Sequence, residues 1–91
     1  MKKQRYTAYY QGQVQGVGFR YSVCRLAGRF DIKGFVHNLA DGRVQVVGEG
    51  QSDELDLFLQ AIDGEMAGHI RGRELDKQEP SGEFRDFGLH W

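Results

Sequence analysis

The chain has 91 residues, which allow one hydrophobic core and exclude a multidomain machine, so residues 1–91 are expected to form a single domain. No apolar run approaches the ~20 residues of a membrane span, and a single cysteine without a signal peptide indicates a cytoplasmic protein. The net charge of −1 argues against a general nucleic-acid binder, which usually has a strongly basic domain.

The beginning of the chain has the period of a strand followed by the period of a helix. Residues 5–14 alternate between apolar and polar side chains, which predicts a strand with one buried face. A glycine-containing turn follows at 15–18, and from residue 19 onward apolar residues recur at helical spacing. The apolar positions of this predicted amphipathic helix are Phe19, Val23, Leu26, Ala27 and Phe30.

The middle of the chain is predicted to contain a β-hairpin. Residues 34–38 and 43–47 are the two strands, and Asp41-Gly42 lies between them. An Asp-Gly pair supplies the left-handed backbone that a tight reversal requires. These two strands are therefore expected to be neighbours in the sheet.

A second helix and two further strands complete the predicted elements. Ser52 is predicted to be the N-cap of a helix that ends near 63–64, because an apolar stripe with i, i+3, i+4, i+7 spacing follows it. That stripe consists of Leu55, Phe58, Leu59 and Ile62. Residues 69–79 and 84–91 are predicted to be strands, with Pro80 in the turn between them.

The order βαββαβ predicts an α+β protein with a ferredoxin-like sandwich. Its sheet is expected to be dominated by antiparallel pairs, with both helices on one face. Enzymes, RNA readers and small-molecule sensors all use this plan. The fold alone therefore does not decide the function.

The segment from Gln15 to Arg20 joins the first predicted strand to the first predicted helix. Unpaired N–H groups and the positive end of the helix dipole converge at such a point, which favours an anion. Gly16 and Gly18 let the backbone turn its N–H groups inward, and the planar Arg20 guanidinium suits two phosphate oxygens. The residues alone also fit a plain glycine turn and a solvated arginine, so both interpretations stay open here.

The charges are unevenly distributed along the chain. Residues 1–40 carry seven Lys or Arg side chains and one Asp, a net charge of +6, whereas the remainder carries −7. The basic part would attract a small anion. The same distribution would also arise if the two groups of charges only solvated opposite faces of the molecule.

Two sequence motifs resemble the signatures of the acylphosphatase family. Residues 12–20, GQVQGVGFR, resemble the first signature, and GFVHN at 34–38 followed by DGRV at 41–44 resembles the second. The motifs have the order and separation found in the family, and the similarity in layout extends over essentially the whole chain. The resemblance implies hydrolysis of the carboxyl-phosphate bond of acyl phosphates without a metal, a cofactor or a covalent intermediate.

The resemblance also implies roles for individual residues. Arg20 corresponds to the phosphate-binding arginine of the family, and Asn38 corresponds to the residue that orients the attacking water, whose proton passes to the phosphate of the substrate. Without the first motif, Asn38 would be taken as an ordinary residue at a strand end. The backbone N–H groups implied to wrap the phosphate are those of Gln15, Gly16, Val17, Gly18, Phe19 and Arg20.

Three positions depart from the usual family pattern. His37 replaces a common lysine or arginine, Asp31 replaces a glycine that often ends the first helix, and Leu89-His90-Trp91 replaces a basic-aromatic ending. None of them changes Arg20 or Asn38. His37 alternates with Asn38 along the strand, so we expect it on the opposite face of the sheet, at the surface.

Other functions fit the sequence less well. Lys33–Val36 and Tyr9 bear a weak similarity to an RNA-binding surface, but the aromatic residues that such a surface needs are missing. A cysteine phosphatase separates its cysteine and arginine by five residues in a loop, whereas four residues lie between Cys24 and Arg29 within the predicted helix. The three histidines have no metal-ligand spacing, so no metal site is predicted.

We therefore predict a monomeric, metal-independent acylphosphatase. Its partners are expected to be an acyl phosphate as substrate and inorganic phosphate as product and competitive inhibitor, with no nucleic acid and no membrane. The alternative is a non-catalytic acylphosphatase-like module that binds an anion or a partner, of the kind found inside larger maturation factors.

Overall fold

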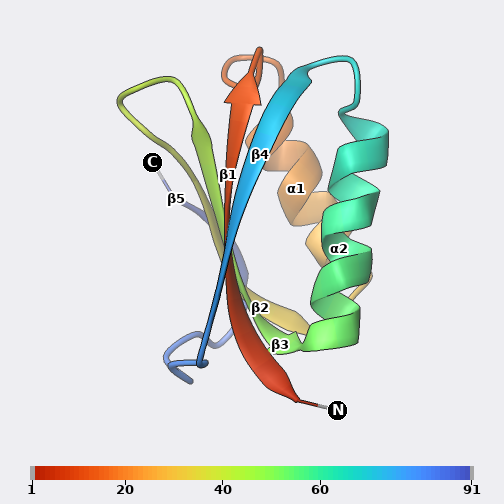
Figure 1. Ribbon diagram of the computed structural model, residues 1–91, viewed down its shortest axis with the longest axis vertical. Coiled ribbons are helices and arrows are strands. Elements are labelled where there is room, and N and C mark those ends of the chain that lie inside the picture. The colour runs from red at the N-terminus through yellow and green to blue at the C-terminus, as the bar shows by residue number, and fades with distance from the viewer. Residues whose placement is uncertain (1, 91) are drawn as a thin grey trace.

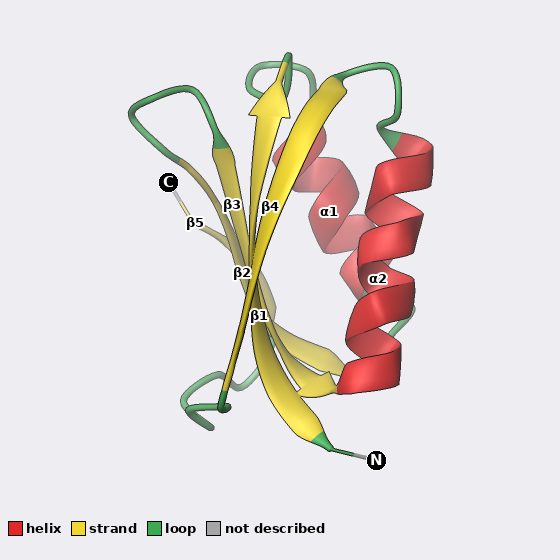
Figure 2. Cartoon of the chain, in the orientation of Figure 1, coloured by secondary structure: helices red, strands yellow, loops and turns green. Residues whose placement is uncertain are grey.

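The computed structural model describes residues 2–90, which fold into two layers (Figure 1). A five-stranded sheet has the strand order β4-β1-β3-β2-β5, and both helices cover one of its faces (Figure 2). This arrangement confirms the predicted ferredoxin-like α+β fold. The elements in chain order are β1 (Lys3–Gly12), α1 (Phe19–Ala27), β2 (Ile32–Asn38), β3 (Val44–Gln51), α2 (Ser52–Glu65), β4 (Ile70–Gln78) and β5 (Phe87–His90).

The pairing of the strands makes the sheet mixed but mainly antiparallel. β1 pairs antiparallel with both β3 and β4, and β3 also pairs antiparallel with β2, which confirms the predicted hairpin. β5 is added next to β2 in the parallel direction. The last strand of the predicted pattern therefore forms an edge of the sheet, and Trp91, its predicted final residue, lies outside the described residues.

The predicted start of the second helix is wrong by one residue. Gln51, with extended backbone, is the N-cap of α2 and makes no side-chain capping bond, and Ser52 is already helical. The reason is the neighbouring strand. Gln51 pairs with Lys3 of β1, and the Ser52 N–H donates to the Lys2 carbonyl at 3.0 Å, so strand geometry continues up to the first turn of the helix.

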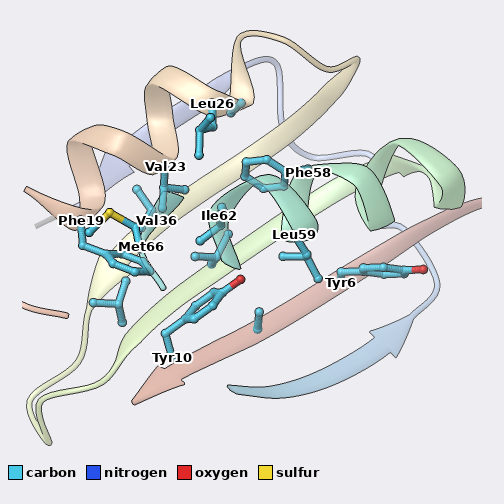
Figure 3. Packing of buried hydrophobic residues seen from close by; sticks show 14 of the residues in the cluster. Tyr6, Tyr10, Phe19, Val23, Leu26, Val36, Phe58, Leu59, Ile62 and Met66 are labelled. Carbon is cyan, nitrogen blue, oxygen red and sulfur yellow. The ribbon is translucent and has the colours of Figure 1, made fainter. Parts of the chain in front are cut away.

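The hydrophobic core lies between the sheet and the helices (Figure 3). The rings of Tyr10 and Phe19 pack with centroids 5.2 Å apart, which joins β1 to the first residue of α1. Both buried tyrosines also reach α2, since the Tyr6 hydroxyl donates to Asp56 at 2.9 Å and the Tyr10 hydroxyl donates to Asp63 at 3.1 Å. These contacts fix α1 and α2 relative to β1, and with them the loop between β1 and α1.

The other face of the sheet is partly covered by the connection between β4 and β5 (Figure 1). Phe84 of this connection contacts the ring of Phe35, with centroids 5.7 Å apart, and the Arg5 guanidinium lies 5.4 Å from the centre of the Phe84 ring. The predicted strand from 84 to 91 thus begins only at Phe87, because residue 84 packs across the sheet instead of along it. Within residues 2–90, neither helix is sufficiently long and apolar to traverse a membrane.

Candidate active site

The loop between β1 and α1 contains two glycines in left-handed conformation. Gly16 has a φ of 77° and Gly18 has a φ of 75°. An added Cβ would meet no other atom within 4 Å at either position, so the backbone conformation, not a shortage of space, requires glycine here. Alternation of left-handed and ordinary residues is the backbone geometry of anion-binding nests.

This loop leads directly into the positive end of α1. Gly18 is the N-cap, and the first backbone bond of the helix runs from the Ser22 N–H to the Gly18 carbonyl at 3.0 Å. The amides of Phe19, Arg20 and Tyr21 come before that bond and therefore have no acceptor within the helix. The first turn of α1 contains no acidic side chain, so nothing in it offsets the positive dipole end. The loop and the helix start together favour an anion.

The Gln15 side chain connects this loop to the turn between β2 and β3. Its Nε2 donates to the Leu39 carbonyl at 2.8 Å and to the Arg43 carbonyl at 3.0 Å. Both acceptors flank the turn that follows Asn38, and both loops lie at the same end of the sheet (Figure 1). The structure therefore brings the segment that contains Arg20 close to the strand end that contains Asn38.

Asn38 is the last residue of β2 and is half-buried. It alternates with His37, so it faces the helix side of the sheet like Val36, which is fully buried. Within residues 2–90 its Oδ1 is buried and accepts no hydrogen bond from the protein. A buried amide oxygen normally has a hydrogen-bond partner, so this atom is suited to hold a water molecule.

His37 lies on the opposite face from Asn38, as its place in the strand predicts. It is half-buried, however, so the prediction of a surface position is only partly right. The reason is the parallel addition of β5, which places a strand on the far side of β2 from β3 and encloses His37 between them.

Arg20 is the second residue of α1 and is half-buried. Its charge acts on the thiol of Cys24, one turn further along the helix, so both side chains lie on the same flank of α1. Burial raises the pKa of Cys24, and the nearby Arg20 charge lowers it by less, so the pKa stays above its ordinary value. Cys24 is thus a protonated thiol near the core and not an activated nucleophile.

The two groups of charge predicted from the sequence do not form separate faces. Ion pairs join the basic first part to the acidic second part, among them Lys2 with Glu79 at 3.4 Å and Arg5 with Glu49 at 3.4 Å. A third such pair joins α1 to α2, between Arg25 and Glu65. Among the basic residues of positions 1–40, Arg20 is the one that follows the β1–α1 loop directly in sequence, as the second residue of α1.

The structure also bears on the alternative sites. Tyr9 does not present a bare ring to a nucleic acid, because the Arg43 guanidinium lies 4.8 Å from its ring centre. Asp41 in turn accepts a bond from the Arg43 Nε at 2.8 Å, which holds that guanidinium in place. Among residues 2–90, no group of three or more His, Cys, Asp or Glu side chains is arranged to hold a metal ion.

The model of the acylphosphatase family matches residues 6–89 of this chain. This chain belongs to the acylphosphatase family. An acylphosphatase from Archaeoglobus fulgidus is 47% identical over 72 residues, which are 78% of this chain and 81% of that protein. The crystal structure of the acylphosphatase from Bacillus subtilis has a TM-score of 0.86 at 27% identity, covering 97% of this chain and 99% of that chain.

The same domain also occurs within a much longer protein. The crystal structure of HypF from T. kodakarensis matches 97% of this chain with a TM-score of 0.83 at 30% identity, but the match covers only 12% of HypF. The acylphosphatase fold and family that the two motifs predict are therefore confirmed, and the chain is an acylphosphatase by family, structure and coverage.

The main feature that sequence reasoning missed in this acylphosphatase site is the side chain of Gln15. The sequence assigns only its backbone N–H to the site. Its amide also bonds to carbonyls that are 24 and 28 residues away in the chain. The sequence does show that Gln15, an amide donor, lies between the predicted strand and the glycine turn. That position alone does not identify the carbonyls to which the amide bonds.

Proposed function

We propose that this acylphosphatase binds the phosphate of its substrate at the β1–α1 loop and directs water at the phosphorus from Asn38. The observation that carries the proposal is the joining of two features by Gln15. One is the β1–α1 loop, whose two left-handed glycines lie just before the positive end of α1. The other is the end of β2, where the amide oxygen of Asn38 is buried. A phosphate bound at the β1–α1 loop therefore lies next to Asn38, whose Oδ1 accepts a hydrogen bond from the attacking water.

The chemistry needs little more than positioning and charge stabilisation. The oxygen of water bonds to phosphorus while the bond from phosphorus to the carboxyl oxygen breaks, which releases a carboxylate and inorganic phosphate. The water proton passes to a phosphate oxygen of the substrate, because the amide of Asn38 cannot remove a proton at neutral pH. A carboxylate is a good leaving group, so no strong base is needed.

Arg20 and the loop amides have the task of stabilising the phosphate charge. A guanidinium can contact two equatorial oxygens at once, and it remains charged at every pH of interest. The amides from Gln15 to Arg20 act as fixed dipoles that need no rearrangement during the reaction. Inorganic phosphate fits the same groups, so we expect it to compete with substrate. We further propose that the protein acts as a cytoplasmic monomer.

The proposal is tested by hydrolysis of benzoyl phosphate in the presence of a metal chelator. Arg20→Ala should lower kcat/KM by at least a hundredfold and weaken inhibition by phosphate, because it removes charge-assisted bonds worth roughly 1.5–3 kcal/mol each. Asn38→Ala should lower kcat by a similar factor but leave the inhibition constant of phosphate within about twofold, because water, not phosphate, is lost.

The two variants serve as controls for each other. Full activity of Asn38→Ala would remove the water-positioning role, and unchanged phosphate inhibition of Arg20→Ala would remove the binding role. Absence of hydrolysis by the unaltered protein would contradict the catalytic proposal as a whole.

The second candidate function is that of a non-catalytic binding module. The observation that favours it is the match to a domain that makes up 12% of HypF, since this fold also serves as one part of a longer chain. A binding module would still bind phosphate, with loss of binding in Arg20→Ala, but it would release no carboxylate from an acyl phosphate. Hydrolysis therefore separates the two candidates.

A further inference from the structure

The turn between β2 and β3 is exposed at its tip. Residues 40–42 are exposed, and Leu39 and Arg43 on either side of them are half-buried. Two backbone bonds close the turn, because the Leu39 N–H donates to the Arg43 carbonyl at 2.8 Å and the Gly42 N–H donates to the Leu39 carbonyl at 3.2 Å. The orientation of the turn, and with it the end of β2 that contains Asn38, therefore depends on polar contacts.

Asp41 fixes the backbone of the turn and the side chain of Arg43 at the same time. Its Oδ1 accepts a bond from the Arg43 N–H at 3.1 Å, and its Oδ2 accepts a bond from the Arg43 Nε at 2.8 Å. A carboxylate that bonds to the backbone two residues further on holds the intervening residue in a turn. That residue is Gly42, which has the left-handed φ of 95° that glycine adopts readily. The guanidinium is thereby fixed relative to the turn.

The Arg43 guanidinium also joins the turn to the centre of the sheet. Its Cζ lies 4.8 Å from the centre of the Tyr9 ring, within the range of a cation–π contact. Tyr9 stands opposite Gln45 in the β1–β3 ladder, so Arg43, two positions before Gln45, is its diagonal neighbour on the face opposite the helices. Because β1 is paired on both sides, by β3 and by β4, the Tyr9 ring is a fixed support.

The backbone of Arg43 meets the two parts of the candidate site. Its carbonyl accepts bonds from the Gln15 Nε2 at 3.0 Å and from the Leu39 N–H at 2.8 Å. The next residue, Val44, pairs with Asn38 in the β2–β3 ladder. Arg43 is therefore connected to the β1–α1 loop, to the strand end with Asn38 and, through its side chain, to the centre of the sheet.

We propose that Asp41 and Arg43 are positioning residues for hydrolysis, which hold the turn on Tyr9 so that the Asn38 amide stays directed at the attacking water. The inference rests on the proposed function, in which Asn38 orients that water. Asp41 and Arg43 act through Asn38 and not on the substrate. A misplacement of about 1 Å can cost a hundredfold in rate, so a loosened turn should lower kcat without weakening the binding of phosphate.

The test measures hydrolysis of benzoyl phosphate and its inhibition by inorganic phosphate. Arg43→Ala and Asp41→Ala should each lower kcat by roughly three- to tenfold, with KM and the inhibition constant of phosphate within about twofold of the unaltered protein. The double variant should lose no more than the weaker of the two single variants, because both changes release the same turn. Tyr9→Phe, which keeps the ring, should retain kcat, whereas Tyr9→Leu should lower it.

Lys77→Ala is the matched control. The Lys77 ammonium lies 5.0 Å from the centre of the Tyr6 ring, so this variant also removes a cation from a ring on β1. The contact lies on the helix side of the sheet, away from the β2–β3 turn, and kcat should be unchanged. A loss of kcat in Lys77→Ala as large as that in Arg43→Ala would overturn the inference, because any such contact on β1 would then have the same effect.

The decisive measurement combines Arg43→Ala with Asn38→Ala. If Arg43 acts by positioning Asn38, its removal from the Asn38→Ala protein lowers kcat no further. A further several-fold loss would overturn the inference. A rise in KM or in the inhibition constant of phosphate that accounts for the loss would also overturn it, since Arg43 would then contact the substrate. Lowered stability with unchanged kcat in both single variants would leave only a structural contact and would likewise overturn it.

Failure of the proposed function gives a different result. Full activity of Asn38→Ala, or absence of hydrolysis by the unaltered protein, would remove the proposed function and this inference with it. An impaired Asn38→Ala together with fully active Arg43→Ala and Asp41→Ala would overturn the inference alone.

Discussion

Gln15 shows how one side chain can hold the two halves of a site together. It is exposed, yet its amide makes two bonds across a sequence separation of 24 and 28 residues. We predict that Gln15→Ala lowers the free energy of unfolding by about 1–2 kcal/mol, since each neutral hydrogen bond contributes roughly 0.5–1.5 kcal/mol. It should also lower kcat, because Asn38 then loses its fixed distance from the β1–α1 loop, where we propose that the phosphate binds.

The matched variant for this prediction is Gln15→Glu. It keeps the size and shape of the side chain but replaces the donor with a carboxylate that faces two carbonyl oxygens. Its loss of stability in urea unfolding and its loss of kcat should be at least as large as those of Gln15→Ala. Equal stability and activity of all three proteins would show that the bond between the loops is unimportant.

The motifs predict Arg20 at a helix start and Asn38 at a strand end, and the structure has both residues at these local positions. Their roles in binding and catalysis are proposals. The contacts of Gln15 and the enclosure of His37 depend on segments that meet only in the folded chain. Periodicity describes one element at a time. It therefore identifies which residues lie on a face, but not what covers that face.

At the scale of elements, the start of α1 depends on the conformation of its N-cap. Gly18 has φ 75° and ψ 17°, a left-handed conformation that costs other residues about 1–2 kcal/mol. We predict that Gly18→Ala lowers the free energy of unfolding by that amount and impairs phosphate binding, because relief of the strain moves the loop amides. Thermal unfolding and phosphate inhibition measure the two effects.

Gly64 of α2, unlike Gly18, is a glycine whose backbone conformation alanine can also adopt. Its φ is not positive, and an added Cβ would meet nothing within 4 Å. Gly64→Ala should therefore stabilise the protein by up to about 1 kcal/mol, because alanine loses less backbone entropy than glycine in a helix. A destabilisation of both variants by the same amount would contradict the role assigned to the left-handed backbone of Gly18.

At the scale of the whole molecule, the sheet order and the covering of its second face could not be predicted from the sequence. β4 is recognisable but alternates poorly, because it is an edge strand with most of its residues exposed. In the loop that follows it, Phe84 lies on the face of the sheet opposite the helices, where its ring packs against the ring of Phe35 and the guanidinium of Arg5. No local pattern in residues 79–86 specifies that contact.

Glu49 of β3 anchors this loop to the sheet and is 8% exposed. Its carboxylate accepts bonds from the Ser81 N–H and hydroxyl, both at 2.8 Å, and from the Gly82 N–H at 2.9 Å. Burial alone raises the pKa of Glu49, but these bonds and the charge of Arg5 outweigh it, so the pKa lies below its ordinary value. The ionised form is therefore the one that the folded protein stabilises.

The lowered pKa of Glu49 determines how the stability depends on pH. Between the folded and the ordinary pKa values, the unfolded chain binds more protons than the folded one, so stability increases with pH in that window. The contribution of Glu49 is complete above its ordinary pKa of 4.5 and is lost as the pH falls through the folded value. Glu49→Gln should cost roughly 2–4 kcal/mol at pH 7 and much less at pH 3.

Glu83 provides the matched control, because it also pairs with Arg5, at 3.1 Å, but is 60% exposed. Glu83→Gln should change the free energy of unfolding by less than about 1 kcal/mol at either pH, as expected for an exposed ion pair. Urea unfolding at pH 7 and pH 3 measures both variants against the unaltered protein. If Glu49→Gln lowered the free energy of unfolding as much at pH 3 as at pH 7, the negative charge of Glu49 would not be what holds the β4–β5 loop on the sheet. The shape of the side chain alone would then account for the position of the loop.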